Sequence, residues 1–470
     1  MLTIATGPAL LTPDAMRAAE AAAIAAGTPA LRLMERAAAA AVMAIDRFVP
    51  GRPALVLCGP GNNGGDGYAV AALLRAQGRS VRVAASAPAH GDPAHGDPAA
   101  IMAARWGVAV ETLDQAAPAP LIIDALFGTG LQRPLSEPVQ AALDRLRSFG
   151  AAVVAMDMPS GIDALTGACL GQPLAADLTV CFGAMKRGQA QQAGRVLSGR
   201  IIVADIGLAL PDYGARLVPP PVRQPLPADT HKYRRGAVLV IEGAPEHGGA
   251  AQLTALGALR SGAGLVTLVG SGCTQPVAAI MRRTDAEGVA MLTDPRMGAV
   301  AIGPGLLADQ RGRDWVYRLL SGTVPLVIDA GAMAALPSTK FAQVQAPRVL
   351  TPHEGEFTRL FGTIGPDRVA AVSAAANASG SVIVLKGAET IIAAPDGRIG
   401  INLHAAPWLA TAGSGDVLTG IIAALIAQGM ALFDAARAGV WLHGDAGRRG
   451  GPGVIADDLP GLMPAVLAAL

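Results

Sequence analysis

The sequence predicts an α/β protein of two domains, each built on a largely parallel sheet, and three observations support this fold class. The chain has 470 residues, whereas a single hydrophobic core stops growing at roughly 250–300 residues. Short, continuously apolar runs alternate with helix-length stretches, a rhythm typical of parallel strands that helices cover on both faces. A proline-rich segment, residues 211–227, interrupts that rhythm near the middle of the chain.

The first domain is expected over residues 1–213 and begins with two helices. Thr12 followed by Pro13 is typical of a helix start, and Gly27 ends that helix. A second helix is expected at about residues 30–48. Six strand-like runs follow, in the order "ALVLCG", "SVRVAA", "LIIDALFG", "AAVVAMDMPSG", "DLTVCFG" and "RIIVADIG". Because helix-length segments separate them, they predict a doubly wound sheet.

A linker is expected over residues 214–228, where prolines remove backbone donors and keep the chain extended. The α/β rhythm then restarts and defines a second domain over residues 229–470. Its strand-like runs are "AVLVIEG", "GLVTLVG", "AVAIGPG", "PLVIDAGA", "RVLTPHEGE" and "SVIVLKGAET". The apolar stretch at residues 417–433 is interrupted by Thr, Gly and Gln, so we expect a buried helix there and not a membrane span.

Charge and composition exclude several function classes. Lys and Arg number 37 against 36 Asp and Glu, which gives a net charge of +1, and aromatic residues make up 3% of the chain. This balance disfavours nucleic acid or an anionic membrane as the main partner, so we expect small-molecule substrates. The N-terminal segment lacks the basic and apolar regions of a secretory signal, and the cysteines form no C-x-x-C pair. We therefore expect a cytoplasmic protein.

The glycine-rich segment "GPGNNGGDG", residues 59–67, follows the first strand-like run and is expected to form a loop before a helix. It contains G-x-G-x-x-G, which would suggest a dinucleotide-binding turn. That motif also requires an acidic residue about 20 residues later, and the run "SVRVAA" does not end in one. Asp66 inside the segment would repel a diphosphate. The segment is therefore not an ordinary dinucleotide-binding turn.

Polar side chains follow three of the predicted strands of the first domain at their carboxyl ends. They are Asn62, Asn63, Asp66, Asp124, Asp157 and Ser160. Because the carboxyl ends of parallel strands line one crevice, we expect these groups to converge. The set contains no His or Cys, so a hard ion such as K⁺, Na⁺ or Mg²⁺ suits it better than a soft metal. The alternative is that these residues only cap the helices that follow.

Three segments of the first domain, "GNNGGDGYAVAALL", "DALFGTGLQRP" and "MDMPSGIDALTG", resemble the NAD(P)H-hydrate epimerase family over about residues 10–210. The resemblance implies a Rossmann-like fold and a domain that interconverts the R and S forms of hydrated NADH or NADPH at C6. The residues it implies as substrate-binding are Asn62, Asn63, Gly64, Gly65, Asp66, Gly128, Thr129, Gly130, Leu131, Gln132, Arg133, Pro134 and Asp157. It also implies a K⁺ ion held by Asn63, Asp124 and Ser160.

Two side chains of this domain are candidates for the chemistry. Asp157 is placed to exchange a proton during epimerisation, and we expect it to be catalytic. Lys186, in "GAMKRG", either offers positive charge to a phosphate or is an ordinary surface lysine.

Of the two glycine-rich segments, "TAGSGDVLTG" in the second domain is the stronger indication of a binding site. Residues 411–415 can expose successive backbone N–H groups, and a helix from about Asp416 adds its positive end, which together form an anion hole. Asp416 is then either a base between a phosphoryl donor and an acceptor hydroxyl or only a charge at the helix start. The domain has no G-x-x-x-x-G-K-[ST] motif, and this combination resembles ribokinase-like enzymes.

Further segments, from "HKYRRGAVLVIEG" through "VLTPHEGEF" to "VIVLKGAET", resemble the ADP/ATP-dependent NAD(P)H-hydrate dehydratase family over about residues 229–465. The residues implied at the hydrate are Ala250, Gly305, His353 and Asp416, with Asp416 catalytic. Those implied at the adenine nucleotide are Lys386, Gly387, Ala388, Glu389, Thr390 and Gly415. Mg²⁺ would accompany ADP or ATP, with Glu354 and Glu356 assisting through water.

The two resemblances together imply a bifunctional metabolite repair enzyme, an isomerase joined to a lyase. The dehydratase would accept the S form, and the epimerase would supply it from the R form. We expect a homo-oligomer. The alternative is a ribokinase-like small-molecule kinase fused to a non-catalytic or dehydrogenase-type nucleotide-binding domain; the missing ribose acid and the presence of Asp66 disfavour the dehydrogenase.

Overall fold

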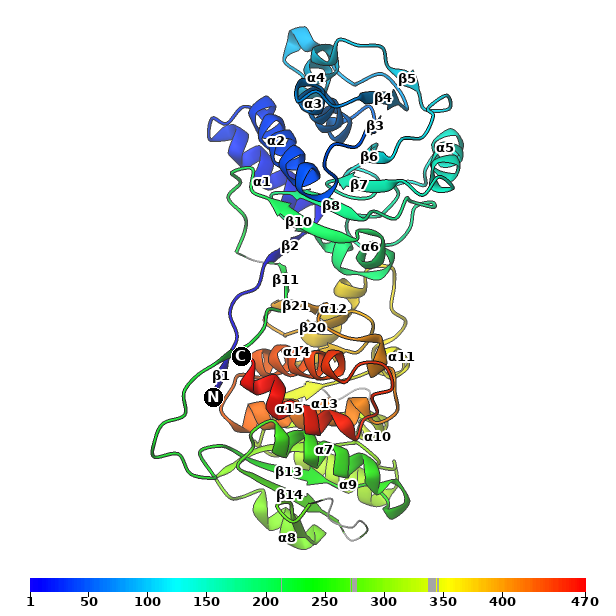
Figure 1. The fold of residues 1–470 in the computed structure, drawn as a ribbon. Helices are drawn as coiled ribbons and strands as arrows, with labels where there is room; N and C mark the ends of the chain where they lie inside the picture. The colour runs from blue at the N-terminus through cyan, green and yellow to red at the C-terminus, as the bar shows by residue number, and fades with distance from the viewer. Residues whose placement is uncertain (213, 271, 273–276, 337–343, 345) are drawn as a thin grey trace. The chain divides into compact units, whose positions relative to one another are not determined.

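The computed structural model describes residues 1–212, 214–270, 272, 277–336, 344 and 346–470. The chain forms two compact units, an N-terminal unit of residues 9–214 and a C-terminal unit of residues 215–470 together with residues 1–8 (Figure 1). No helix in the described part of the chain combines the length and apolarity needed to cross a membrane.

The N-terminal unit is built on a seven-stranded sheet in the order β10-β8-β7-β6-β3-β4-β5, in which all neighbouring strands are parallel. The strands are β3 (Ala54–Cys58), β4 (Val81–Ala85), β5 (Glu111–Thr112), β6 (Leu121–Ala125), β7 (Ala152–Met156), β8 (Leu178–Phe182) and β10 (Arg200–Ala204). Two short strands, β2 (Ala9–Leu11) and β9 (Met185–Lys186), pair with each other in parallel. The expected doubly wound, Rossmann-like sheet is confirmed.

The strand order explains where this sheet can bind a ligand. The chain runs outward from β3 to β4 and β5 and then returns to β6 on the other side of β3. The loops after β3 and β6 therefore diverge at the carboxyl edge, and such a switch point is where doubly wound sheets hold their ligands.

Helices cover both faces of this sheet. One face packs against α2, α3 and α4, and the other against α5. The helices are α1 (Pro13–Ala25), α2 (Ala30–Phe48), α3 (Asn62–Ala76), α4 (Pro98–Trp106), α5 (Glu137–Arg147) and α6 (Gln192–Leu197), with 3-10 turns η1 (Pro93–His95) and η2 (Arg187–Ala190). The expected start of α1 is confirmed, because the Thr12 hydroxyl accepts a hydrogen bond from the Ala15 N–H over 3.2 Å.

The glycine-rich segment differs from its expectation, because α3 begins at Asn62 and includes most of the glycines that we expected to form a loop. Close packing makes this helix possible. A Cβ on Gly64 would lie 1.8 Å from the carbonyl oxygen of Gly59, and one on Gly67 would lie 2.6 Å from the Cβ of Ala125. The glycines thus bring the first turn of α3 against β3 and β6.

The C-terminal unit has a mostly parallel sheet in the order β15-β14-β13-β16-β17-β18-β19-β20-β21-β11, with β20 antiparallel to both of its neighbours. The strands are β13 (Ala237–Ile241), β14 (Leu265–Val269), β15 (Met281–Arg283), β16 (Met297–Ile302), β17 (Leu326–Ile328), β18 (Arg348–Leu350), β19 (Val382–Leu385), β20 (Thr390–Ala393), β21 (Ile399–Asn402) and β11 (Ala215–Leu217). The helices are α7 (Gly248–Arg260), α8 (Asp285–Met291), α9 (Gln310–Leu320), α10 (Ala330–Ala335), α11 (Glu354–Phe361), α12 (Arg368–Ser379), α13 (Ser414–Ala427), α14 (Leu432–Gly450) and α15 (Asp458–Ala468), with 3-10 turns η3 (Pro245–His247) and η5 (Pro407–Leu409).

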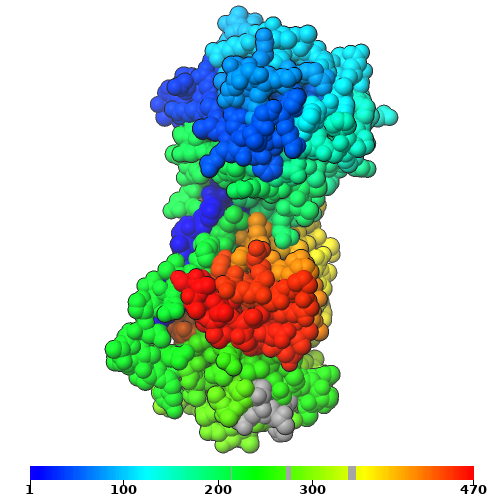
Figure 2. Space-filling view, in the orientation of Figure 1, coloured from blue at the N-terminus to red at the C-terminus, as the bar shows by residue number. Residues whose placement is uncertain are grey.

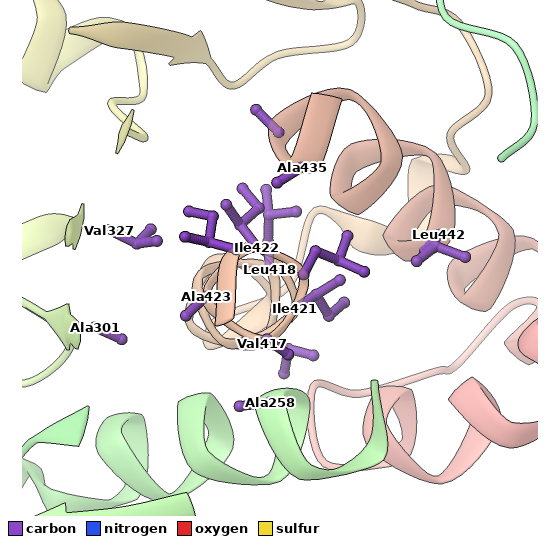
Figure 3. Packing of buried hydrophobic residues seen from close by; sticks show 14 of the residues in the cluster. Ala258, Ala301, Val327, Val417, Leu418, Ile421, Ile422, Ala423, Ala435 and Leu442 are labelled. Atoms are coloured by element: carbon purple, nitrogen blue, oxygen red, sulfur yellow. The ribbon is translucent and has the colours of Figure 1, made fainter. Parts of the chain in front are cut away.

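Helix α13 is the centre of this unit's core. Its apolar side chains meet Ala258 of α7 on one side, Ala301 and Val327 of the sheet on another, and Ala435 and Leu442 of α14 on a third (Figure 3). The chain after α13, in orange-red and red, forms part of the surface of this unit in Figure 2, beside segments in green. The expected buried helix is therefore confirmed, although it ends at Ala427 and α14 begins at Leu432.

The ends of the expected domains differ from the compact units. Residues 1–8, expected in the first domain, belong to the C-terminal unit, where β1 (Leu2–Thr3) pairs with β12 (Val222–Arg223). Arg437 also donates a hydrogen bond to the carbonyl of Ala5 over 2.7 Å. Residues 214–228 contain β11 and β12, so this proline-rich segment is partly built into a sheet. Such long-range pairing leaves no local sequence signal.

Candidate active sites

A cavity of about 760 Å³ opens at the switch point of the N-terminal sheet. Its lining residues are Arg17, Glu20, Pro60, Gly61, Asn62, Asn63, Asp66, His90, Leu126, Phe127, Gly128, Thr129, Gly130, Leu131, Gln132, Arg133, Asp157 and Phe182. The N-cap of α3 is Gly61, which has no side chain that could cap the helix. Its backbone N–H groups thus remain available to an anionic ligand in the cavity.

Asp157 is held rigidly at the end of β7. Its backbone has a φ of 63°, unusual for a residue with a side chain. Carboxylate oxygen Oδ1 accepts hydrogen bonds from the Phe182 N–H (3.2 Å) and from the Lys186 ammonium. Oxygen Oδ2 accepts none within the described residues and lies 3.4 Å from the position that a Cβ on Gly128 would take. One oxygen is thus anchored while the other faces the loop after β6.

Lys186 is fully buried, so its interpretation as an ordinary surface lysine is wrong. Besides Asp157, its ammonium donates hydrogen bonds to the carbonyl oxygens of Phe182 (3.2 Å) and Ala184 (3.0 Å). All three ammonium protons therefore have partners inside the protein. The lysine holds the Asp157 carboxylate in place.

Two further carboxyl groups share this cavity. Burial, with the negative charges of Asp157 and Glu20 next, raises the pKa of Asp66 well above its usual range. Burial and then the charge of Asp157 also raise the pKa of Glu20, partly offset by Lys186 and Arg17. The cavity thus combines an anchored aspartate with acids that retain their protons more readily than in water.

The expected ion ligands lie near the same edge. Asp124 is fully buried; its Oδ1 accepts a hydrogen bond from the Ser160 hydroxyl (2.6 Å) and its Oδ2 one from the Ser160 N–H (2.8 Å). Burial raises the pKa of Asp124. The side-chain nitrogen Nδ2 of Asn63 is buried without a hydrogen-bond partner among the described residues, and its Oδ1 lies 3.5 Å from the position that a Cβ on Gly128 would take, near Oδ2 of Asp157.

Most residues expected to bind the hydrate line this cavity. Asn62, Asn63, Asp66, residues 128–133 and Asp157 do so. The described lining does not include Gly64, Gly65 or Pro134. Gly65 is packed instead against Ala99 and Met34, where a Cβ would lie within 2.8 Å of either.

In the C-terminal unit, several expected residues gather at the carboxyl ends of adjacent strands. Lys386 follows β19, and its ammonium lies 2.7 Å from Oδ1 of Asp329, which follows β17. The other oxygen of Asp329 accepts a hydrogen bond from the Thr419 hydroxyl over 2.8 Å. A Cβ on Gly415 would lie 3.2 Å from the ammonium of Lys386, so only glycine leaves this space open.

Asp416 lies in the first turn of α13, two residues after the helix begins at Ser414. Burial and then repulsion from Asp329 raise its pKa to about 7, with Lys386 opposing the shift. A carboxyl group with this pKa exchanges protons near neutral pH. The N-cap of α13 is Gly413, which has no side chain. The N–H groups of Ser414 and Asp416 donate to the carbonyls of Thr411 (3.4 Å) and Gly413 (3.1 Å), whereas the Gly415 N–H has no backbone acceptor among the described residues and can face an anion.

A buried histidine contacts the first turn of α13. Nε2 of His443, on α14, lies 3.1 Å from the Ser414 hydroxyl oxygen. Burial lowers the pKa of His443 to about 4, so this imidazole is neutral at physiological pH.

The remaining expected residues surround this edge. Gly305, after β16, accepts a hydrogen bond from the Ala244 N–H, and Ala250 lies in the first turn of α7, the helix that follows Ala244 and η3. His353 caps α11 by accepting from the N–H groups of Gly355 and Glu356. The segment from Lys386 to Thr390 connects β19 to β20, and Glu389 within it is buried beside Arg368.

Sequence reasoning missed several site residues. Asp329 stands at the end of a strand-like run. It could have been found in the same way as Asp124 and Asp157, by looking for polar residues at the carboxyl ends of parallel strands. Arg17, Glu20 and His90 line the N-terminal cavity from outside the strand ends, and no local pattern marks them. His443 likewise lies in the middle of a long helix.

Two family models match this chain. Residues 30–188 match the model described as the YjeF-related protein N-terminus, and residues 238–451 match the model of NAD(P)H-hydrate dehydratase. A structure of the ADP/ATP-dependent NAD(P)H-hydrate dehydratase of Bacillus subtilis, co-crystallised with ATP and Mg²⁺, is 29% identical with a TM-score of 0.46 and covers 52% of this chain and 93% of its own.

Relatives of nearly the full length carry both regions. The bifunctional NAD(P)H-hydrate repair enzyme of Moorella thermoacetica is 36% identical, over 94% of this chain and 93% of its own. That of Gloeobacter violaceus is 37% identical, over 96% of each chain. The chain therefore belongs to the family of bifunctional NAD(P)H-hydrate repair enzymes, which join an NAD(P)H-hydrate epimerase to an NAD(P)H-hydrate dehydratase.

Proposed function

We propose that the cavity of the N-terminal unit is the epimerase site and that the first turn of α13 is the dehydratase site. The anchored carboxylate of Asp157 carries the first assignment, because its Oδ2 accepts no hydrogen bond from the described residues and can exchange a proton with a bound hydrate. The uncapped turns of α3 and the loop 128–134 would hold the dinucleotide's phosphates.

In the dehydratase site, Asp416 would take the proton of the C6 hydroxyl while that oxygen attacks a nucleotide phosphate. Loss of phosphate from C6 and of a proton from C5 then restores the nicotinamide double bond. The pKa of about 7 suits Asp416 to this role. The segment 386–390 and Gly415 would hold ADP or ATP, and Ala250, Gly305 and His353 would contact the hydrate.

Mg²⁺ would enter this site with the nucleotide and neutralise phosphate charge. Of the two acidic residues that follow His353, Glu354 has a side chain that is 63% exposed; its Oε2 pairs with Arg368 over 3.2 Å, and its other oxygen could meet a hydrated ion. Glu356 is buried and accepts a hydrogen bond from the His353 N–H, so it serves the helix cap.

A K⁺ ion would be held in the epimerase unit by Asn63, Asp124 and Ser160. The buried Asp124 carboxylate supports this, because its described partners are a hydroxyl and backbone N–H groups, none of them a cation. A buried carboxylate without a counter-charge is unfavourable, and amide, hydroxyl and carboxylate oxygens suit a hard ion. The homo-oligomeric state stays a prediction.

A mixture of R and S hydrates of NADH, with ADP or ATP and Mg²⁺, tests both sites. The unmodified chain should convert the whole mixture to NADH, measured by near-ultraviolet absorbance. The Asp157→Ala variant should convert only the S half, and Asp416→Ala should convert none while still interconverting the epimers. Complete conversion by both variants would contradict the assignment, and a Lys232→Ala variant, altered at an exposed residue, is the matched control.

A further inference from the structure

The epimerase cavity contains a carboxyl group outside the strand-end loops, that of Glu20 on α1. This helix is positioned by the strand before it. In the β2–β9 pair, Leu11 lies opposite Lys186, so α1 begins directly beside the lysine that anchors Asp157.

The face of α1 that carries Glu20 is fixed by packing. Met16, four residues earlier and therefore on the same face, is buried with Leu11 and Ala184. A Cβ on Gly183 would lie 3.1 Å from the methyl group of Met16. Since the carbonyls of Phe182 and Ala184 bind Lys186, Glu20 extends from a helix packed on the turn that holds the Asp157–Lys186 pair.

The charges around Glu20 suit it to carry a proton. The groups that face it are Asp157, Asp66, Lys186 and Arg17, and His90 and Arg133 line the same cavity. One buried ammonium thus acts electrostatically on three carboxyl groups, of which Asp157 is in contact with it. Asp66 is only 9% exposed, whereas the partly exposed Glu20 can exchange its proton with water in the cavity.

We propose that Glu20 is a second catalytic residue of the epimerase site, paired with Asp157. This inference rests on the proposed role of Asp157 as a proton-exchanging group. Inversion at C6 needs one group to donate a proton and another to accept one, on opposite faces of the ring. Glu20 and Asp157 both line the cavity and reach it from different elements, α1 and the end of β7.

The step balances without any other reactant. Glu20 gives its proton to the C6 hydroxyl, the C6–O bond breaks, water leaves, and the N1 lone pair forms an iminium bond to C6. A water molecule then adds to the opposite face of C6, and Asp157 takes its proton, which restores the N1–C6 single bond. In the reverse direction the two carboxyl groups exchange roles, and solvent restores their protons.

The test uses the full chain and one purified epimer of the NADH hydrate, without ADP or ATP, with the epimers separated by chromatography. Glu20→Gln should lower kcat for epimerisation by about 10²- to 10⁴-fold with little change in KM. Glu20→Asp should recover part of the rate. In the direction of epimerisation in which Glu20 is the acid, kcat of the unmodified chain should fall as the pH rises, because Glu20 loses its proton. In Glu20→Gln this fall should be absent.

Two controls separate chemistry from folding. Glu35→Gln removes a carboxylate of the neighbouring α2 that pairs with Arg32 and Arg105 at the surface, and it should epimerise normally. ATP-dependent dehydration of the S hydrate by the Glu20→Gln chain should also be unchanged. If Glu20→Gln epimerises with an unaltered kcat while Asp157→Asn is inactive, the role of Glu20 is overturned but the role of Asp157 is not.

Labelled water tests the step itself. In H₂¹⁸O, each inversion should place one solvent oxygen at C6, after subtraction of the exchange seen without enzyme. Retention of the original oxygen would indicate cleavage of the N1–C6 bond and would overturn this role for Glu20. If the unmodified chain interconverts no epimers, the proposed function of the cavity fails as well.

Discussion

The two sites use the same pair of residue types in different ways. Each unit places a lysine against an aspartate at the carboxyl edge of a parallel sheet, Lys186 with Asp157 and Lys386 with Asp329. Lys186 is fully buried, whereas the side chain of Lys386 is 22% exposed. In the N-terminal unit the lysine binds the proposed catalytic aspartate, while in the C-terminal unit it binds a neighbour of the proposed base.

This difference shows how one kind of ion pair can serve two purposes. Lys186 anchors the Asp157 carboxylate, and it opposes the rise that burial and neighbouring carboxyl groups cause in the pKa values of Asp66 and Glu20. Lys386 pairs with Asp329, whose charge adds to burial in raising the pKa of Asp416. In both sites the aspartate–lysine pair thus sets the charge felt by nearby carboxyl groups.

The largest expected effect comes from removing each lysine. Lys186→Met should lower the free energy of unfolding of the N-terminal unit by about 3–5 kcal/mol, since a buried carboxylate loses its partner. Lys386→Met should cost about 1–3 kcal/mol in the C-terminal unit, because water reaches that site. Urea unfolding, followed unit by unit, measures both.

The double variant Asp157→Leu with Lys186→Met provides the control, because an apolar pair of similar volume should restore most of the stability without restoring epimerisation. If the double variant is as unstable as the single one, the uncompensated charge is not the cause. Equal losses from the two single lysine variants would contradict the difference in burial.

A smaller effect concerns pH and Asp416. Its folded pKa of about 7 lies above the unfolded value, so the folded state binds the extra proton and stability falls as pH rises from about 4 to 7. Asp416→Asn should therefore stabilise the C-terminal unit at pH 8 by about 1–2 kcal/mol, allowing for screening by solvent, and leave it unchanged at pH 4. Dehydration should in turn accelerate as pH rises through about 7. Melting curves measured at pH 4 and pH 8 test this. If Asp416→Asn is no more stable than the unmodified chain at pH 8, the raised pKa of Asp416 is contradicted.

A positioning effect is expected at His443. His443→Phe removes the partner of the Ser414 hydroxyl and should raise KM for ATP by about five- to tenfold, with a smaller change in kcat. His231→Phe, altered at an exposed histidine, is the matched control. Unchanged KM for ATP in steady-state kinetics would show that His443 does not support the anion hole.

The smallest effect concerns two helix caps. Thr12→Ala removes the cap of α1 and should destabilise the N-terminal unit by about 1 kcal/mol. Asp367→Ala removes the cap of α12, where Asp367 accepts from the Ala370 N–H, and should affect the C-terminal unit by a similar amount. Thermal melting of each unit separates the two, and only the Thr12 variant should also slow epimerisation, because α1 carries Glu20.

The sequence alone determined the two α/β domains, their family and most of the strand-end residues. Asp124, Asp157 and Ser160 could be grouped from their positions in the chain, because parallel strands bring their carboxyl ends to one edge. Asp416 could be identified because a glycine-rich turn before a helix is a local pattern.

Only the tertiary structure decided the partners of these residues. The burial of Lys186 against Asp157, the approach of Glu20 on α1 and the contact of His443 with Ser414 join segments far apart in the chain. The assignment of residues 1–8 to the C-terminal unit has the same origin. Local patterns report which element forms, whereas burial and charge pairing depend on which elements pack together, so these features lay beyond the sequence.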